Sequence, residues 1–215
     1  MMPFTGRTFR AVLFDNDGTL VDSMPAAMRA WTKWVGEHDI PLSALEGIAG
    51  MPAAAIIAQI APHLDPAAAL ARITELEMAD TDGVVALPGG IEAVRATYGC
   101  CAIVTSATAG LAAARIAAAG IPTPTRLVTA DDITRGKPDP QPFLIAAQQL
   151  GVDPQQCLVV EDAPSGITSG RAAGCATLGL TTSTPASALH ADLVVATLAD
   201  VLLEPTPTGI RVRRR

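Results

Sequence analysis

The sequence predicts an α/β fold: a parallel sheet covered by helices, with a block of helices inserted after the first strand. Short apolar runs alternate with helical segments from about residue 88 onward, an order typical of right-handed βαβ units. Residues 25–80 show helical patterns with no strand signal between them. Polar residues follow several of the apolar runs, and ligands of such sheets bind beyond the carboxyl ends of the strands.

The composition is that of a globular domain without a basic face. The chain has 215 residues, enough for one large domain with a smaller insert. Apolar residues make up 49% and aromatic residues 3%, which favours helices packed closely through small side chains. The net charge of −6 and the pI near 5.0 argue against a nucleic-acid partner. No apolar run approaches the ~20 residues of a membrane helix, and residues 1–10 lack an apolar signal region. We therefore expect a cytoplasmic protein.

The first strand ends in two carboxylates. Residues 10–14 form an apolar run, and Asp15-Asn16-Asp17-Gly18 follows it. In extended chain, Asp15 and Asp17 point the same way. Their charges repel, so the pair needs a bound cation or one shared proton. A metal-bound carboxylate can act as a nucleophile and a protonated neighbour as a general acid. A plain polar turn is the alternative, whereas a calcium loop is excluded because Met24 stands where it needs a glutamate.

The insert is predicted to contain four short helical segments. In the first, Met28, Trp31, Trp34 and Val35 recur at helical spacing after Pro25. The remaining segments are expected over residues 42–48, 52–60 and 67–80. The insert therefore spans residues 23–87.

The remainder is predicted to be one core domain, residues 1–22 and 88–204, followed by a tail. Its later strands are expected over residues 101–105, 127–129, 157–160, 176–180 and 193–195, and its helices over 91–97, 111–119, 140–150 and 165–173. Glycines at 166, 170 and 174 would let the last helix pack closely on the sheet. The four cysteines begin apolar runs and are expected to be buried and reduced. Residues 205–215 end in a run of arginines, which we interpret as a solvated, disordered tail.

Three further segments place polar residues at the same sheet edge. These are Thr105-Ser106, Lys137 and Glu161-Asp162. Taken singly, they could be a helix cap, a solvated charge and a turn. Together with Asp15 and Asp17 they supply what phosphoryl transfer requires: a nucleophile, a proton donor, a cation and fixed hydrogen bonds.

The four segments, in this order, resemble the haloacid dehalogenase superfamily of phosphatases. The resemblance covers residues 10–203 and implies a Rossmann-like core with a helical cap inserted after the first strand, as in the subfamily of β-phosphoglucomutase. It implies Asp15 as nucleophile, Asp17 as general acid, and Thr105, Ser106 and Lys137 as phosphate-binding residues. Mg²⁺ would be bound by Asp15, Asp17 and Asp162, with Glu161 as a further candidate ligand. Residues 22–31 and 86–89 most resemble those of the bacterial hexose-phosphate (sugar) phosphatases of that subfamily. They also resemble those of the yeast-type deoxyglucose-phosphate and glycerol-phosphate phosphatases.

This resemblance implies a magnesium-dependent phosphatase that hydrolyses small sugar phosphates through an aspartyl phosphate, as a monomer or weak dimer. A β-phosphoglucomutase-type mutase is the nearest alternative. Asp17 argues against dehalogenase chemistry. A phosphonate hydrolase would need a lysine in the cap, but the only lysine of the insert, Lys33, is expected on a solvated face. A response-regulator receiver lacks such an insert. We expect the loop of residues 47–52 to select the substrate.

Overall fold

A parallel sheet of six strands forms the centre of the molecule. The structure is a computed structural model and describes residues 4–48 and 51–215. The strand order is β6-β5-β2-β7-β8-β9, and β2 pairs with both β5 and β7. The strands are β2 (Ala11–Phe14), β5 (Cys101–Val104), β6 (Leu127–Val128), β7 (Cys157–Glu161), β8 (Ala176–Leu180) and β9 (Leu193–Val195). The predicted α/β fold is confirmed.

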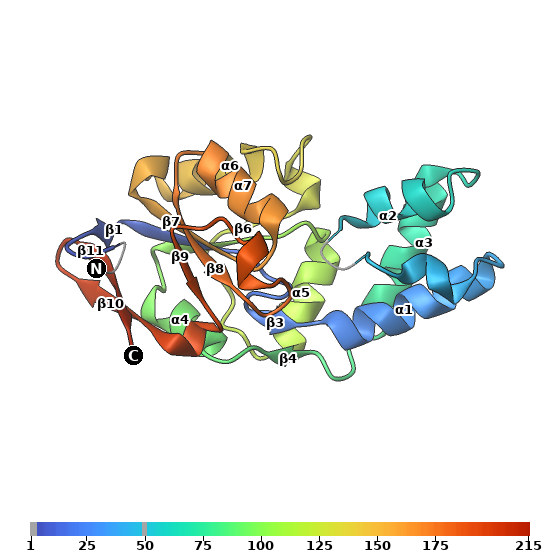
Figure 1. Cartoon of the computed structure of the whole chain (residues 1–215), viewed down its shortest axis with the longest axis horizontal. Helices are drawn as coiled ribbons and strands as arrows, with labels where there is room; N and C mark the ends of the chain where they lie inside the picture. The colour runs from blue at the N-terminus through green and yellow to red at the C-terminus, as the bar shows by residue number, and fades with distance from the viewer. Residues whose placement is uncertain (1–3, 49–50) are drawn as a thin grey trace.

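Helices cover both faces of this sheet, as Figure 1 shows. One face carries α4 (Gly90–Ala96) and α5 (Ala109–Ala118), and the other carries α6 (Gln141–Leu150) and α7 (Pro164–Ala172). Because both faces are covered, β2, β5, β7 and β8 are buried along their whole length. Short 3-10 turns lie in the connections: η2 (Ala130–Asp132), η3 (Pro154–Gln156), η4 (Ala186–Ala188) and η5 (Leu198–Asp200).

The segment between β2 and α4 forms a separate group of helices, which we call the cap (Figure 1). It contains α1 (Met24–Glu37), η1 (Leu42–Leu45), α2 (Ala53–Ile60) and α3 (Pro66–Ala79). Trp31, Trp34 and Val35 are buried in its own apolar cluster, and the indole N–H of Trp34 donates to the carbonyl of Ala69 at 3.2 Å. The helix expected over residues 42–48 is only the 3-10 turn η1, because the backbone turns extended at Glu46 (ψ 129°) and Gly47 follows at φ 78°.

The two ends of the cap meet in a small sheet, for which the sequence gives no signal. Here β3 (Val21–Asp22) pairs antiparallel with β4 (Val85–Ala86). The cap is therefore attached to the core by two paired strands.

The glycines of α7 allow the close packing that was expected. A Cβ at Gly166 would lie 1.7 Å from Glu161 Oε1, and one at Gly170 would lie 3.0 Å from the side chain of Val159. Gly174 differs, since it lies beyond the helix at φ 86° and permits the turn into β8.

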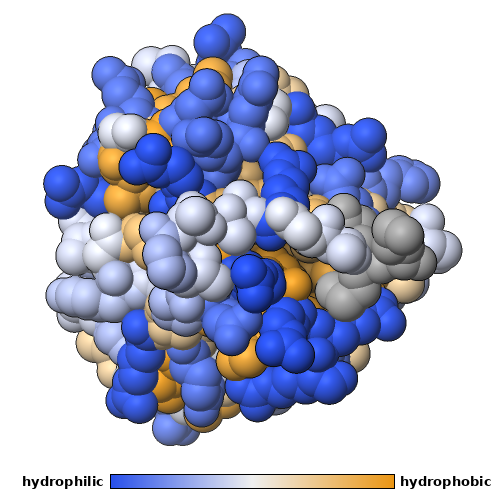
Figure 2. Space-filling model, turned by 90° about the vertical axis from the view of Figure 1, so that its left-hand side faces the viewer, coloured by the Kyte–Doolittle hydropathy of each residue, from blue (hydrophilic) through white to orange (hydrophobic). Residues whose placement is uncertain are grey.

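The C-terminal residues are not a disordered tail, and that expectation was wrong. Residues of β10 (Val201–Thr206) and β11 (Gly209–Arg214) form a hairpin, and β11 pairs with β1 (Thr8–Phe9). Ile210 and Val212 alternate with exposed arginines, so one face of the hairpin is buried while the arginines remain in water. Figure 2, which views this end of the molecule, shows a largely hydrophilic surface.

Two further expectations concern membranes and thiols. In the part of the chain that the structure describes, every helix is too short or too polar to cross a bilayer. The four cysteines are free thiols, and all except the half-buried Cys100 are buried.

Candidate active site

Five of the seven predicted site residues line a cleft between the core and the cap, and Glu161 and Asp162 lie behind it. The cleft measures about 430 Å³. On the core side it is lined by Asp15, Asp17, Thr105, Ser106 and Lys137, all at the carboxyl end of the sheet. Ile48, Met51 and Pro52 of the predicted specificity loop also line it, whereas residues 49 and 50 of that loop lie outside the described residues.

Asp15 and Lys137 form a buried ion pair at the base of this cleft. Asp15 follows β2 directly, and its Oδ1 accepts from Lys137 Nζ at 2.6 Å. The same ammonium donates to Glu161 Oε1 at 2.8 Å and to the carbonyl of Val104 at 3.0 Å. Lys137 thus joins the ends of β2, β5 and β7 and fixes Asp15 between them.

Glu161 is fully engaged by the protein itself. Its Oε1 accepts from Lys137, and its Oε2 accepts from the backbone N–H groups of Asp162 and Ala163 at 2.9 and 2.8 Å. The absence of a side chain at Gly166 makes room for this carboxylate. Glu161 therefore positions Lys137 and the loop that follows β7.

Asp162 lies close to Asp15 and away from the cleft wall. Its Oδ1 accepts from Thr19 Oγ1 at 3.2 Å, and its Oδ2 accepts from Ser183 Oγ. Only glycine fits at position 18, where a Cβ would lie 2.1 Å from Asp162 Oδ2 and φ is 87°. Oxygens of Asp15, Glu161 and Asp162 all lie within 4.8 Å of one another. Clustered carboxylate oxygens of this kind fit a hard cation such as Mg²⁺.

The pKa shifts of the clustered carboxylates also favour a cation site. Burial raises the pKa of Asp15 to about 7, with Lys137 opposing and Glu161 adding to the shift. Burial, with the charge of Asp15, raises the pKa of Asp162 to about 6, and burial also raises that of Glu161. Burial tends to lower the pKa of Lys137, but Asp15 and Glu161 outweigh it and raise that pKa overall. Three carboxylates thus lie near one ammonium, which pairs with only two of them, and a cation would offset the excess negative charge.

Asp17 is held by a different set of donors. Its Oδ1 accepts from Ser23 Oγ at 2.6 Å and from Arg115 Nη1 at 3.0 Å. Its Oδ2 has longer contacts, with Asn16 Nδ2 at 3.2 Å and Thr105 Oγ1 at 3.4 Å. The structure therefore brings Asp17 to the same cleft as Asp15 but outside the carboxylate cluster.

Thr105 and Ser106 follow β5 on the opposite side of Asp15 from β7. The Thr105 hydroxyl accepts from the N–H of Ala107 at 3.1 Å, while Ser106 is exposed at the cleft. Both hydroxyls border the space in front of Asp15.

Arg115 and Glu77 also belong to the site, although neither was predicted from the sequence. Arg115 belongs to α5 and lies on its buried face with Leu111, and its Nη2 donates to Glu77 Oε1 of α3 at 3.1 Å. A charged residue at the i+4 position of an apolar helix face is the signal that could have identified it.

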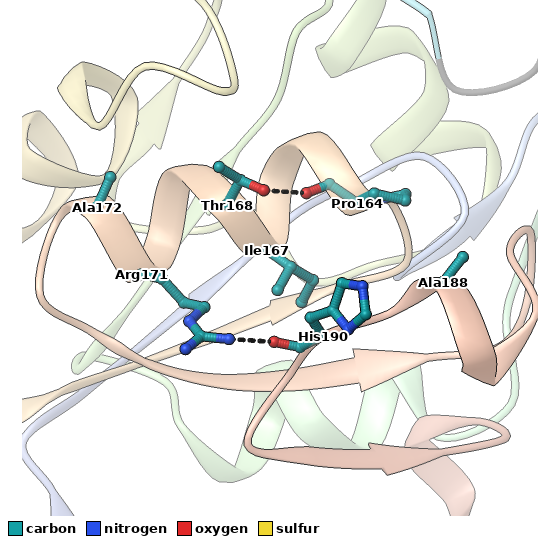
Figure 3. Close-up of a pocket in the computed structure, with 7 residues that line it drawn as sticks. All are labelled: Pro164, Ile167, Thr168, Arg171, Ala172, Ala188 and His190. Atoms are coloured by element: carbon teal, nitrogen blue, oxygen red, sulfur yellow. Dashed lines mark hydrogen bonds between the residues drawn. The ribbon is translucent and has the colours of Figure 1, made fainter.

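A second hollow of about 460 Å³ lies on the outer side of α7. Figure 3 shows its lining, in which Arg171 donates to the carbonyl of His190 at 2.6 Å. None of the residues that line it belongs to the predicted site.

Comparison with known proteins places this geometry in a family. The family model of haloacid dehalogenase-like hydrolases matches residues 9–174, a range that holds all the predicted site residues. The chain belongs to the haloacid dehalogenase-like hydrolases. The resemblance inferred from the four motifs is thereby confirmed.

Individual relatives of this hydrolase agree. Hexitol phosphatase A of Escherichia coli (strain K12) is 39% identical over 208 residues, covering 93% of this chain and 96% of that protein. A fructose-1-phosphate phosphatase of the same organism is 34% identical over 176 residues, covering 77% and 93%. The crystal structure of β-phosphoglucomutase from Clostridium difficile, 21% identical, superposes with a TM-score of 0.75 over 89% of this chain and 92% of that one. This last similarity concerns the fold alone.

Proposed function

We propose that this hydrolase is a magnesium-dependent phosphatase of small sugar phosphates. The observation that carries the proposal is the cleft itself, in which Asp15, paired with Lys137, and Asp17 face one space from the core side. The names of the relatives at 39% and 34% identity support a phosphorylated sugar or polyol as the substrate.

Each site residue has a defined task in this reaction. Asp15 attacks the phosphorus atom while the bond from phosphorus to the sugar oxygen breaks, and Asp17 gives its proton to that oxygen. Water then attacks the aspartyl phosphate, Asp17 takes a proton from this water, and the bond between phosphorus and Asp15 breaks. Inorganic phosphate and the free Asp15 carboxylate result.

The remaining residues hold the phosphoryl group. Lys137 offers a fixed positive charge to its oxygens, and Thr105 and Ser106 offer hydroxyl donors from the other side. Asp15 and Asp162, with the main-chain carbonyl of Asp17, would hold Mg²⁺, while Glu161 keeps Lys137 in place. The cation, when bound, neutralises charge on the phosphoryl oxygens.

Net hydrolysis is favoured over mutase activity by the cap side of the cleft. Its lining is mostly apolar and includes Met28, Trp31 and Leu70. Ser23, Thr74 and Glu77 are its polar residues. A mutase must release and rebind a bisphosphorylated intermediate, which would require a cluster of polar or basic groups on the cap.

The test is a panel of sugar and polyol phosphates, assayed with Mg²⁺ and with excess chelator. We expect phosphate release from six-carbon substrates only with the metal. Glucose 1-phosphate and glucose 6-phosphate are then followed for phosphate release and for interconversion in the same reaction. Interconversion faster than phosphate release would establish the mutase instead, and full activity in chelator would refute the metal requirement.

A further inference from the structure

One arginine connects the cap to the side chain of Asp17. Arg115 Nη1 lies 3.0 Å from Asp17 Oδ1, and Arg115 Nη2 lies 3.1 Å from Glu77 Oε1. Glu77 belongs to the cap helix α3, whereas Arg115 belongs to the core helix α5. The side chains of Arg115 and Glu77 are only 9% and 10% exposed. The bridge is therefore a buried contact between the two parts of the molecule.

The bridge has an electrostatic requirement. Glu77 and Asp17 both approach the cleft, and burial raises the pKa of Glu77. Without Arg115, two carboxylates would face each other in a poorly solvated space, and an unpaired buried charge is costly. The same two helices also touch at Gly110, where an added Cβ would lie 3.2 Å from Met78 Cε. The position of α3 is thus tied to that of Arg115.

The bridge also distinguishes the two oxygens of Asp17. Oδ1 is taken by two donors, Ser23 and Arg115, at 2.6 and 3.0 Å. Among the residues that the structure describes, Oδ2 has only the longer contacts of 3.2 and 3.4 Å with Asn16 and Thr105. With Oδ1 saturated, Oδ2 is the oxygen that remains to exchange a proton with the sugar oxygen.

We propose that Arg115 is a positioning residue for the general acid, and that Glu77 fixes Arg115 from the cap. This inference rests on the proposed phosphatase function, in which Asp17 protonates the leaving oxygen. Arg115 turns Oδ2 of Asp17 toward the substrate, and α3 must be in place for Arg115 to do so. The cap thereby contributes to proton transfer as well as to substrate choice.

The test compares two leaving groups in single turnovers with enzyme in excess, which isolates cleavage of the ester bond. An alkyl phosphate, such as the best sugar phosphate of the panel, needs a proton on its leaving oxygen. The p-nitrophenolate of p-nitrophenyl phosphate leaves without one. Arg115→Met is the main variant. The matched control is Arg72→Met, because Arg72 likewise bridges two carboxylates, Glu37 and Glu75, at 2.6 Å each but away from the cleft.

We expect Arg115→Met to slow cleavage of the sugar phosphate by at least ~10-fold, since general acid catalysis contributes ~10²–10⁴-fold. Cleavage of p-nitrophenyl phosphate should stay within about threefold of the wild type, because its transition state needs no proton. Arg115→Lys should restore part of the lost rate, as one ammonium can still contact Asp17. Arg72→Met should change neither rate.

Parallel losses on both substrates would overturn the proposal, as would an unchanged rate or a rise in KM alone. If Arg115→Met does not fold, the double variant Arg115→Met/Glu77→Gln removes one of the two opposed charges and must show the same selective loss. Any alkyl phosphate that the wild type cleaves can serve as the substrate whose leaving oxygen needs a proton. If the wild type cleaves another alkyl phosphate but no sugar phosphate, the proposed substrate class is wrong. The Arg115 comparison is then made with that alkyl phosphate and p-nitrophenyl phosphate.

Discussion

The core and the cap line the same cleft with different kinds of side chains. The core supplies charged and hydroxyl groups that hold one another, as in the contacts of Lys137 with Asp15 and Glu161. The cap supplies mainly apolar groups such as Trp31, Ile56 and Leu70. A fixed polar network suits chemistry that is common to many substrates. An apolar wall can change shape without disturbing that network. We infer that the core sets the reaction and that the apolar wall of the cap sets the substrate preference.

This contrast is tested most severely by Asp15→Asn. The amide cannot attack phosphorus, so turnover should fall by at least ~10³-fold while the fold persists. Steady-state phosphate release and circular dichroism measure the two effects. A variant that kept near-normal turnover would mean that the core nucleophile is misassigned.

Lys137→Met should have the next largest effect. The change leaves Asp15 and Glu161 without their shared cation, so kcat should fall by ~10²-fold or more and the free energy of unfolding by ~3–5 kcal/mol. Urea unfolding and phosphate release measure these losses. Arg135→Met is the control, because Arg135 is 70% exposed and pairs with Asp139 at the surface, so its removal should cost less than ~1 kcal/mol.

The stability of the metal-free protein should fall as the pH rises from 5 to 8. Burial gives Asp15 and Asp162 folded-state pKa values of about 7 and about 6, above those of the unfolded chain. The folded state therefore binds more protons, and stability is lost as these groups ionise. We expect Tm to drop by several degrees, since ~1 kcal/mol shifts Tm by ~2–4 °C at this size.

Mg²⁺ should reverse this loss at pH 8, because it binds the ionised carboxylates. Calorimetry with and without the metal measures it. Asp162→Asn should abolish the gain, and a metal-free Tm that is flat or rises with pH would contradict the cluster as described.

Substitution in the cap should have the smallest effect on turnover. Leu70→Ala enlarges the apolar wall, so the order of preferred substrates should change while kcat on the best one stays within about tenfold, as expected for a change of pocket volume. The control is Leu42→Ala, at a cap residue that is 61% exposed. A loss of all activity in Leu70→Ala would show that the apolar wall of the cap does more than select the substrate.

The sequence predicts the core more fully than the connections of the cap. Asp15, Thr105 and Asp162 follow apolar strands, and the carboxyl ends of parallel strands must meet at one edge. Arg115 was missed because one charged residue in an alanine-rich helix is read as solvated. The two-residue strands β3 and β4 are too short to show a period, since they pair only through tertiary contact.

The C-terminal hairpin was missed for a different reason. Ile210 and Val212 alternate with arginines in β11, a period of two that indicates a strand. The arginines and the neighbouring prolines suggested a solvated tail instead. Pairing with β1 near the other end of the chain stabilises this hairpin, and sequence separation hides such a contact.

The central claim is that Asp15 of the core carries the phosphoryl group during turnover. Rapid quenching of the Asp17→Asn variant with p-nitrophenyl phosphate, followed by peptide mass spectrometry, tests it directly. The first transfer needs no proton, whereas hydrolysis of the intermediate lacks its base, so the peptide that contains Asp15 should gain one phosphoryl group. Release of p-nitrophenol with no phosphorylated peptide, or with the phosphoryl group on another residue, would contradict the account.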